Sequence, residues 1–258
     1  MQDARELIDK LNLCGKPLSK GHSRLAEYIA QHYDKAIFMT ADQLGKQAQV
    51  SESTVVRFAI ASEIDEGDVL RTVLKNDMQN IRKTVDALNE ADFQNAVRRL
   101  ESAEHIYIMG LSSAAPLAQF MYHYMHQILS DVLLVQNTTG DVFEEIARIG
   151  AKDVLVGVSF PRYSTRTLEC MRFARQNGAQ VIAVTDGDMS PLRAASDVCL
   201  CASTDMASFV DSLAAPLSVI NALIVSLGLR RREELGEHFK RLEGIWNAHS
   251  VYIDKQDE

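Results

Sequence analysis

Apolar runs of strand length alternate with amphipathic segments through the C-terminal part of the chain. Each run is apolar throughout, as expected for a strand buried on both faces of a sheet, and the segments between them repeat apolar residues at helical spacing. This alternation predicts an α/β domain with a five-stranded parallel sheet between two layers of helices. The predicted strands are Ile106–Met109, Val132–Gln136, Val154–Val158, Val181–Thr185 and Val198–Cys201.

The first part of the chain has a helical pattern only. Apolar residues recur at helical spacing in residues 3–13, after Pro17, after Thr40 and after Ser51. The hydroxyl of Ser51 suits the N-cap of the last of these helices. Two helices joined by the short turn Gln49–Val50 form the arrangement that places its second helix in the major groove of DNA. The pattern therefore predicts an all-α N-terminal domain that contains a helix-turn-helix.

The predicted helix-turn-helix has an apolar face and a polar face. On the polar face, Ser and Thr can bond phosphates or base edges, and Arg can bond a phosphate or a guanine edge. The same side chains could instead form the solvated surface of a helical hairpin. The small core should contain Leu44, Ala48, Val50 and Val55, followed on the same side by Val56, Phe58 and Ala59, whereas the residues expected to face DNA are Ser51, Ser53, Thr54 and Arg57.

Two further segments carry more apolar residues than one edge of the sheet is expected to cover. Residues 68–100 are helical in pattern, and their apolar stripe from Val69 to Leu88 could contact a partner subunit or only cover the edge of the sheet. Residues 210–227 are apolar over much of a helix circumference, and a final helix follows from near Arg230. Because apolar surface of this extent usually marks an interface, we expect a homodimer or a homotetramer.

Hydroxyl side chains follow two neighbouring strands. Ser112 and Ser113 follow the first strand, and the loop Ser159–Thr167, with two arginines, follows the third. Free N–H groups and a helix dipole at such turns can hold an anion, and loops beyond the carboxyl ends of parallel strands can face one crevice. The other interpretation is an ordinary strand-to-helix turn with capping hydroxyls. Neither loop has a dinucleotide or P-loop motif, so no cofactor is expected.

The quoted motifs resemble a known family. Gly110-Leu-Ser-Ser113, the Ser159–Thr167 loop and Val181–Asp186 with Ser190–Leu192 resemble the SIS (sugar isomerase) phosphosugar-binding domain. Residues 40–58 look like the helix-turn-helix of the RpiR/MurR transcriptional regulators, a family that joins these two domains in this order. The resemblance implies a flavodoxin-like strand order, double-stranded operator DNA as a partner and a phosphorylated sugar as the effector.

The resemblance also implies which residues bind the effector. Pro161 stands where the SIS pattern has a serine, and Arg162 stands where it has glycine. Arg162 could replace the lost donor with a charge-assisted phosphate contact, or it could point to solvent. Asp186 could accept hydrogen bonds from sugar hydroxyls, or cap the turn before Ser190. The implied ligand-binding set is Ser112, Ser113, Ser159, Arg162, Ser164, Thr167 and Asp186.

The chain departs from the family pattern after Phe58. Residues 63–68 resemble sequence that lies well beyond the recognition helix in the family, so an intervening segment is either deleted or absent from this numbering. We place the domains at residues 1–60, a helix-turn-helix domain apparently truncated after residue 59, and 61–258, a SIS domain with a leading linker helix.

Charge and cysteine content refine this assignment. The net charge of −8 comes from residues 61–258, whereas residues 1–60 are nearly neutral, which is a weak electrostatic footprint for a DNA-binding domain. The four cysteines, at 14, 170, 199 and 201, lack zinc-site spacing, so we expect no metal and reduced, buried thiols. No run reaches the 18 apolar residues typical of a membrane helix and no signal peptide is evident, which fits a cytoplasmic protein without a membrane partner.

These observations favour a ligand-controlled transcriptional regulator without catalytic residues. The alternative is a sugar-phosphate isomerase-type enzyme with a helical N-terminal extension. Such an enzyme needs a base placed against a carbon-bound proton, and the nearest candidates are His123, Glu144 and Glu145. A third possibility is a ligand-sensing oligomer that has lost DNA binding through the deletion after Phe58.

Overall fold

The computed structural model describes residues 19–36, 39–63, 68–136, 141–207 and 210–252. The chain divides into two compact units. One consists of Met1–Arg82 with Thr204–Ala214, and the other of Lys83–Ser203 with Ala215–Glu258. The helix predicted at residues 3–13 lies outside the described residues.

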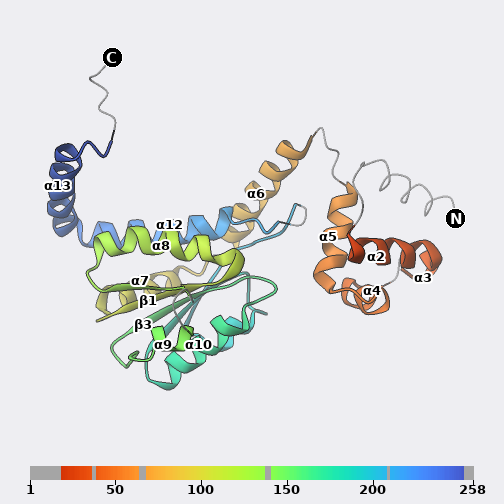
Figure 1. The fold of residues 1–258 in the computed structure, drawn as a ribbon, viewed down its shortest axis with the longest axis horizontal. Coiled ribbons are helices and arrows are strands. Elements are labelled where there is room, and N and C mark those ends of the chain that lie inside the picture. The colour runs from red at the N-terminus through yellow and green to blue at the C-terminus, as the bar shows by residue number, and fades with distance from the viewer. Residues whose placement is uncertain (1–18, 37–38, 64–67, 137–140, 208–209, 253–258) are drawn as a thin grey trace, which may run out of the picture. The chain divides into compact units, whose positions relative to one another are not determined.

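The second unit is built around the predicted parallel sheet. All neighbouring strands are parallel, and their order is β2-β1-β3-β4-β5 (Figure 1). This is the flavodoxin-like order, so the fold-class prediction is confirmed, with strand ends that differ by at most one residue from the predicted ones. The strands are β1 (Ile106–Gly110), β2 (Val132–Val135), β3 (Val154–Val158), β4 (Gln180–Thr185) and β5 (Val198–Cys201).

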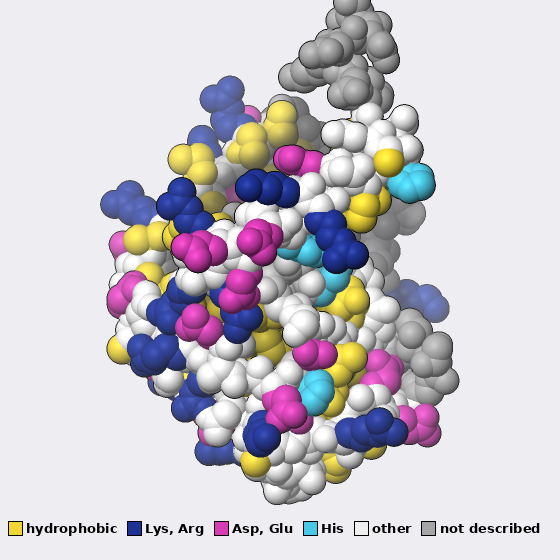
Figure 2. All heavy atoms as spheres, turned by 90° about the vertical axis from the view of Figure 1, so that its left-hand side faces the viewer, with side chains coloured by type: hydrophobic (Ala, Val, Ile, Leu, Met, Phe, Trp, Pro, Cys, Tyr) yellow, Lys and Arg dark blue, Asp and Glu magenta, His cyan; other side chains and the backbone are white. Residues whose placement is uncertain are grey.

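Helices cover both faces of the sheet (Figure 1). The layer on one face consists of α7 (Glu90–Ser102), α8 (Ala115–Ile128) and α12 (Ala214–Arg230), and the layer on the other face consists of α9 (Val142–Glu145), α10 (Thr165–Gln176) and α11 (Pro191–Ala194). Alternate strand residues such as Met109 and Leu155 pack against Met171 of α10 in a fully buried core. The last helix, α13 (Arg232–Ala248), has no buried residue. The face that carries it mixes basic and acidic side chains (Figure 2).

The long helical segment predicted from residue 68 to 100 is two helices. The first, α6, spans Val69–Asp86, and α7 begins at Glu90. The reason is local: Asn89 caps α7, because its side-chain oxygen accepts the N–H groups of Ala91 at 3.0 Å and Asp92 at 3.2 Å. The predicted stripe therefore ends before Leu88, which lies in the turn between the helices.

One side of α6 forms hydrogen bonds, and its apolar side is exposed to solvent. Its amide side holds the segment after β5: Asn76 and Asn80 donate to the Asp205 carbonyl at 2.6 and 2.8 Å, and Asn80 accepts the Asp205 N–H at 3.1 Å. Ser212 donates to Asp77 at 2.7 Å on the same side. The apolar side is exposed, with Val69, Leu70, Val73, Leu74, Met78, Ile81 and Val85 all open to solvent.

The helix-turn-helix is present in the first unit. Its core contains Leu44, Ala48 and Val55, as predicted, together with Leu25 and Phe58, and Val50 packs against it half-buried. Val56 and Ala59, two other apolar residues of the last helix, are exposed, because this helix packs through Val55 and Phe58. The helices are α2 (Lys20–Gln31), α3 (Tyr33–Ala36), α4 (Ala41–Gln47) and α5 (Glu52–Glu63).

Among the helices of the described residues, no single one is long and apolar enough to cross a bilayer. Only α12 and α13 together, across a 98° bend, have that length and composition.

Candidate DNA-binding and ligand-binding sites

The two hydroxyl loops leave the sheet side by side. From β1 the chain proceeds to β2 on one side, and from β3 it proceeds to β4 on the other, so the strand order reverses between β1 and β3. Gly110 at the end of β1 is the register partner of Val158 at the end of β3. The following helices, α8 and α10, lie on opposite faces of the sheet (Figure 1). Such a reversal opens a crevice beyond the carboxyl ends of the strands.

The first loop is tightly wound. A side chain at Gly110 would place its Cβ 2.7 Å from the Ala114 carbonyl oxygen, so only glycine fits there. Ser112 has a φ of 54°, in the left-handed region that non-glycine residues rarely adopt outside functional sites. The side chains of Ser112 and Ser113 are exposed, and α8 begins without a side-chain cap. The loop therefore presents two exposed hydroxyls beside an uncapped helix N-terminus.

The second loop holds its serines through their oxygen lone pairs. Ser159 Oγ accepts the Ser164 N–H at 3.0 Å, and Ser164 Oγ, the N-cap of α10, accepts the Thr167 N–H at 3.2 Å. A hydroxyl that accepts in this way still has its own proton to donate. Among the hydrogen bonds of the described residues, the N–H groups of Thr165 and Arg166 have no acceptor, as is usual in the first turn of a helix.

Thr167 and Arg162 of this loop differ sharply in burial. Thr167 is completely buried, and within the described part of the chain its Oγ1 has no hydrogen-bond partner. Arg162 is exposed with a φ of 68°, which explains why the SIS pattern has glycine at this position. The neighbouring Arg166 lies 3.4 Å from Asp141 and 3.6 Å from Glu169, so part of its charge is already neutralised.

Asp186, at the end of β4, is fastened to the second loop. Its carboxylate accepts from the Tyr163 hydroxyl at 2.9 and 3.1 Å and from the Thr185 hydroxyl at 3.1 Å. Burial and then the bond to Asp186 raise the pKa of Tyr163 to about 12, so the phenol is protonated at neutral pH. The following helix, α11, is capped by Ser190, whose hydroxyl oxygen accepts the Leu192 N–H.

Tyr163 was not among the predicted site residues. It lies in a loop without periodicity, and only the pairing of β3 with β4 brings it to Asp186. A tyrosine within a hydroxyl-rich loop was the one available signal.

The candidates for proton transfer lie elsewhere. Glu145 accepts the Gln136 N–H at 3.1 Å, Glu144 is exposed on α9, and His123 stacks edge-on with Tyr124 on the exposed side of α8. In the described residues none of the three hydrogen-bonds to a crevice hydroxyl. The part of the chain that the structure covers also contains no cluster of three His, Cys, Asp or Glu suited to a metal ion.

The helix-turn-helix presents its hydroxyls differently. Gln49 has a φ of 55° in the turn, and a Cβ at Gly45 would lie 2.9 Å from the Val50 carbonyl oxygen, so the tight turn requires that glycine. Ser51 caps α5 as predicted, because its Oγ accepts the Thr54 N–H at 3.3 Å. The Ser51 hydroxyl also lies 3.0 Å from that of Ser53 and 2.8 Å from that of Thr54. Ser51 is exposed and the other two are half-buried.

Arg57 does not face outward as the sequence analysis expected. Its Nε and Nη2 are buried, and neither has a hydrogen-bond partner within the described residues. Burial, followed by the charge of Arg57, lowers the pKa of His22, which places the guanidinium near the start of α2. His22 in turn contacts Phe58 edge-on, with ring centroids 5.6 Å apart. The side chain thus turns back toward α2.

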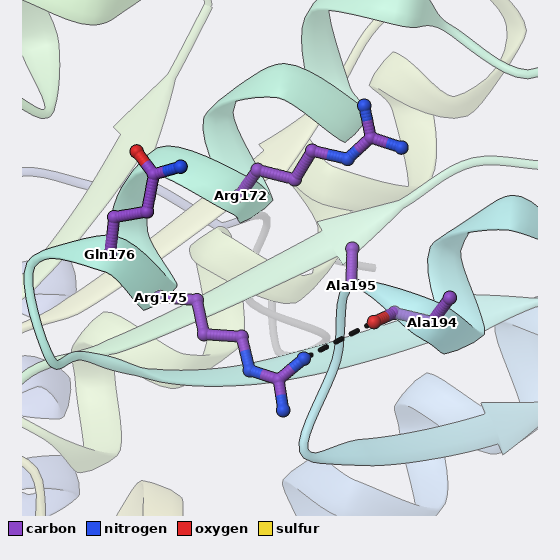
Figure 3. Close-up of a pocket in the computed structure, with 5 residues that line it drawn as sticks. All are labelled: Arg172, Arg175, Gln176, Ala194 and Ala195. Atoms are coloured by element: carbon purple, nitrogen blue, oxygen red, sulfur yellow. Dashed lines mark hydrogen bonds between the residues drawn. The ribbon is translucent and has the colours of Figure 1, made fainter.

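Two hollows in the sheet domain lie away from the crevice. One of about 590 Å³ is at the amino ends of β1 and β3, where His105 hydrogen-bonds Asp153 at 2.9 Å. That bond raises the pKa of His105. The other, of about 290 Å³, lies between the ends of α10 and α11, where Arg175 reaches the Ala194 carbonyl at 3.2 Å (Figure 3).

Comparison with known proteins identifies both domains. Residues 5–61 match the helix-turn-helix domain of the rpiR family, and residues 99–226 match the SIS domain. The transcriptional regulator HexR of Pseudomonas aeruginosa is 24% identical over 93% of this chain and 95% of its own length. HexR of Escherichia coli is 24% identical over 92% of this chain and 93% of its own.

Solved structures with low sequence identity share the fold. The NanR protein of Vibrio vulnificus, complexed with ManNAc-6P, superposes with a TM-score of 0.61 at 18% identity, covering 96% of this chain and 100% of that one. The sugar isomerase domain of an RpiR transcription factor from Sphaerobacter thermophilus gives a TM-score of 0.66 at 22% identity, covering 68% of this chain and 98% of that one.

The comparison with HexR also bears on the missing segment. The alignment with the Pseudomonas protein extends over 278 positions, more than the 258 residues of this chain, although it uses only 93% of them. HexR therefore has residues without a counterpart here. With a helix-turn-helix of the rpiR family joined to a SIS domain on a five-stranded parallel sheet, the chain belongs to the RpiR family of transcriptional regulators.

Proposed function

We propose that this regulator binds operator DNA through residues 1–60 and senses a phosphorylated sugar through residues 61–258. The observation that carries the proposal is the reversal of strand order between β1 and β3, where two hydroxyl loops and two helix N-termini follow neighbouring strand ends. A helix N-terminus favours an anion through its dipole and its free N–H groups.

The phosphate would lie between the two loops. Ser159 and Ser164 use lone pairs within the loop, so their hydroxyl protons remain for the anion, together with the N–H groups of Thr165 and Arg166. Ser112 and Ser113 would close the cradle from the β1 side. Arg162 would supply the positive charge that a phosphate monoester needs. The buried hydroxyl of Thr167 would support the cradle from below.

The sugar would extend toward β4. Asp186 already accepts from Tyr163 and Thr185, and a carboxylate has lone pairs for further donors. We propose that it accepts from a sugar hydroxyl and that Tyr163 holds it in place for this purpose. An unphosphorylated sugar would leave the donors of the cradle without a partner, so phosphate should be required for tight binding.

On the DNA side, Ser51, Ser53 and Thr54 would contact phosphates or base edges. Arg57 would join them by turning outward. The cost of that rotation is small, because a buried guanidinium without an acceptor is unfavourable and a DNA phosphate gives it one.

The same proposal requires an oligomer. Exposed apolar residues on α6 and on α12, among them Leu217, Val225 and Leu229, suit a homodimer or homotetramer. Two recognition helices would then bind a pseudo-palindromic site, and the effector would alter their spacing. By linkage, DNA must change the affinity for the sugar by the same factor.

A sugar-phosphate isomerase remains the second candidate. Phosphoheptose isomerase GmhA of Neisseria gonorrhoeae superposes with a TM-score of 0.52 at 18% identity, which shows a shared fold and nothing of the reaction. Against it, the described residues place no paired acid and base at the crevice. Turnover of a phosphosugar panel would favour the enzyme.

The test is calorimetric titration of the full chain with matched phosphorylated and free sugars. Ser159→Ala should weaken binding of the phosphorylated member by about 1–3 kcal/mol, the range for hydrogen bonds to charged groups. The control is Ser196→Ala, which removes a half-buried hydroxyl elsewhere in the same domain, one that donates to the Arg193 carbonyl at 3.0 Å. Equal affinity for both sugars, or equal loss in the two variants, would refute the site.

A further inference from the structure

The edge strand β5 ends in two cysteines whose sulfur atoms face each other. Cys199 and Cys201 are two residues apart on one strand, so their side chains point to the same face of the sheet. Their Sγ atoms are 3.9 Å apart, and all three cysteines of the described residues are free thiols. Cys199 is buried and Cys201 is half-buried, so one member of the pair is open to a small reagent.

We propose that Cys199 and Cys201 form a reversible dithiol–disulfide pair that responds to hydrogen peroxide or an alkyl peroxide. The proposal is independent of the sugar effector. It assigns a modification site to the edge strand β5, which contains none of the proposed ligand-binding or DNA-binding residues.

The geometry allows the bond and also makes it labile. The sulfurs must approach from 3.9 Å to the ~2.05 Å of a disulfide. Residues two apart in a strand have Cα atoms about 6.6 Å apart, at the upper end of the range that a disulfide tolerates. The oxidised strand would therefore be strained, and strained disulfides are readily reduced, as a reversible switch requires.

The hydrogen bond between the two thiols and their different burial separate their roles. The hydrogen bond from Cys199 and the charge of Arg193 lower the pKa of Cys201, against burial and the charges of Asp188 and Asp186. The same hydrogen bond and burial raise the pKa of Cys199. Arg193 is itself paired with Asp188 at 2.9 Å. The half-buried Cys201 is thus the better nucleophile, and Cys199 is placed to resolve it.

The chemistry balances in two steps. The Cys201 thiolate attacks the terminal peroxide oxygen and the O–O bond breaks. Hydroxide leaves from hydrogen peroxide, or alkoxide from an alkyl peroxide, and takes up a proton as water or as the alcohol. The Cys199 sulfur then attacks the resulting sulfenic acid, the S–O bond breaks, and the departing hydroxide takes the Cys199 proton and leaves as water. Two thiols are oxidised by two electrons, and one peroxide is reduced.

Closing the pair would disturb the end of β5. Cys201 is the register partner of Thr185, and the Ala202 N–H donates to the Thr185 carbonyl at 2.7 Å. The next residue, Ser203, donates its N–H to the Thr84 hydroxyl of α6 at 2.9 Å. A disulfide between residues 199 and 201 must shift one or both of these hydrogen bonds. Oxidation should therefore change the structure at the turn after β4 or at α6.

The test is thiol mapping of the full chain after peroxide treatment. Tryptic cleavage after Arg193 and Arg230 yields a peptide that contains Cys199 and Cys201 and no other cysteine. We expect it to lose two hydrogen masses, to resist alkylation, and to recover both properties with dithiothreitol. The internal control is Cys170, which lies on a separate peptide and whose pKa is raised to about 12 by burial. Its alkylation after denaturation should not change.

Single variants check the assigned roles. In Cys199→Ser, peroxide should leave Cys201 as a sulfenic acid that dimedone traps. In Cys201→Ser, Cys199 should react with peroxide at least about tenfold more slowly than Cys201 does in Cys199→Ser. Both cysteines remaining alkylatable after treatment would overturn the proposal, as would a disulfide between chains on a non-reducing gel, or sulfinic acid at Cys201 with Cys199 intact.

Discussion

Two helix N-termini in this protein, those of α5 and α10, have nearly the same sequence chemistry and different structures. Each is capped by a serine whose oxygen accepts an N–H group three residues on, at 3.3 Å for Ser51 and 3.2 Å for Ser164. At α5 the remaining hydroxyl bonds join side chain to side chain on an exposed surface. At α10 the hydroxyls bond the backbone of the loop that joins β3 to this helix and of its first turn.

The difference separates adaptable contacts from a preorganised site. Hydroxyls that bond one another on an exposed surface can exchange those bonds for DNA phosphates at little cost. The loop before α10 has fixed oxygen positions, so its free protons and N–H groups point in directions set by the fold. The arginines differ in the same sense. Arg57 has a buried Nε and Nη2 without an acceptor among the described residues, whereas Arg162 is exposed on a left-handed backbone.

The largest expected effect comes from Ser164→Asp. Aspartate keeps the N-cap of α10 and suits the helix dipole, so the free energy of unfolding should change little. Its negative charge would face the phosphate and weaken effector binding by about 2–4 kcal/mol. Titration calorimetry and urea unfolding measure the two quantities. Full affinity in a stably folded variant would place the phosphate elsewhere.

Arg57→Met tests whether the Arg57 side chain contributes to the stability of the fold or to DNA binding. Removing an unpaired buried charge should leave the free energy of unfolding equal or raise it by about 1 kcal/mol. Operator affinity should fall by about 1–3 kcal/mol if Arg57 turns outward to DNA. Arg98→Ala, an exposed arginine of α7, is the matched control for the loss of charge. A loss of stability with unchanged operator binding would assign Arg57 to the fold alone.

Ser51→Asp is the counterpart of the Ser164 change at the other helix. The cap of α5 is retained, but a negative charge is placed among DNA phosphates, so affinity should fall by about 1 kcal/mol and most clearly at low salt. Fluorescence anisotropy at two salt concentrations gives the answer. If the variant binds operator as tightly as the parent at low salt, this helix end does not approach the DNA backbone.

The smallest effect concerns the backbone at Arg162. Both Arg162→Gly and Arg162→Ala remove the guanidinium and should weaken effector binding alike. Glycine accepts the φ of 68° without strain, so the glycine variant should unfold with a free energy higher by roughly 1 kcal/mol than the alanine variant. Thermal and urea unfolding compare them. Unchanged effector affinity in both would show that Arg162 points to solvent.

Much of the architecture could be read from local pattern. Strands buried on both faces carry apolar residues at every position, and capping residues act within a few residues of themselves. The five strands, the Ser51 cap and most of the helix-turn-helix core were therefore predictable. The same holds for the two hydroxyl loops, which follow neighbouring strands of the sheet.

Only the tertiary structure decided how the site residues are used. The bond of Tyr163 to Asp186 joins residues on two adjacent loops, and nothing in either loop alone encodes the partner. The inward turn of Arg57 depends on the packing of α2 beside α5. The burial of Thr167 depends on the contact of α10 with the sheet. The sequence alone predicts hydrophobic periodicity and helix capping, because these patterns extend over only one or two turns. Contacts between segments distant in sequence depend on the packing of the whole domain, which no single segment specifies.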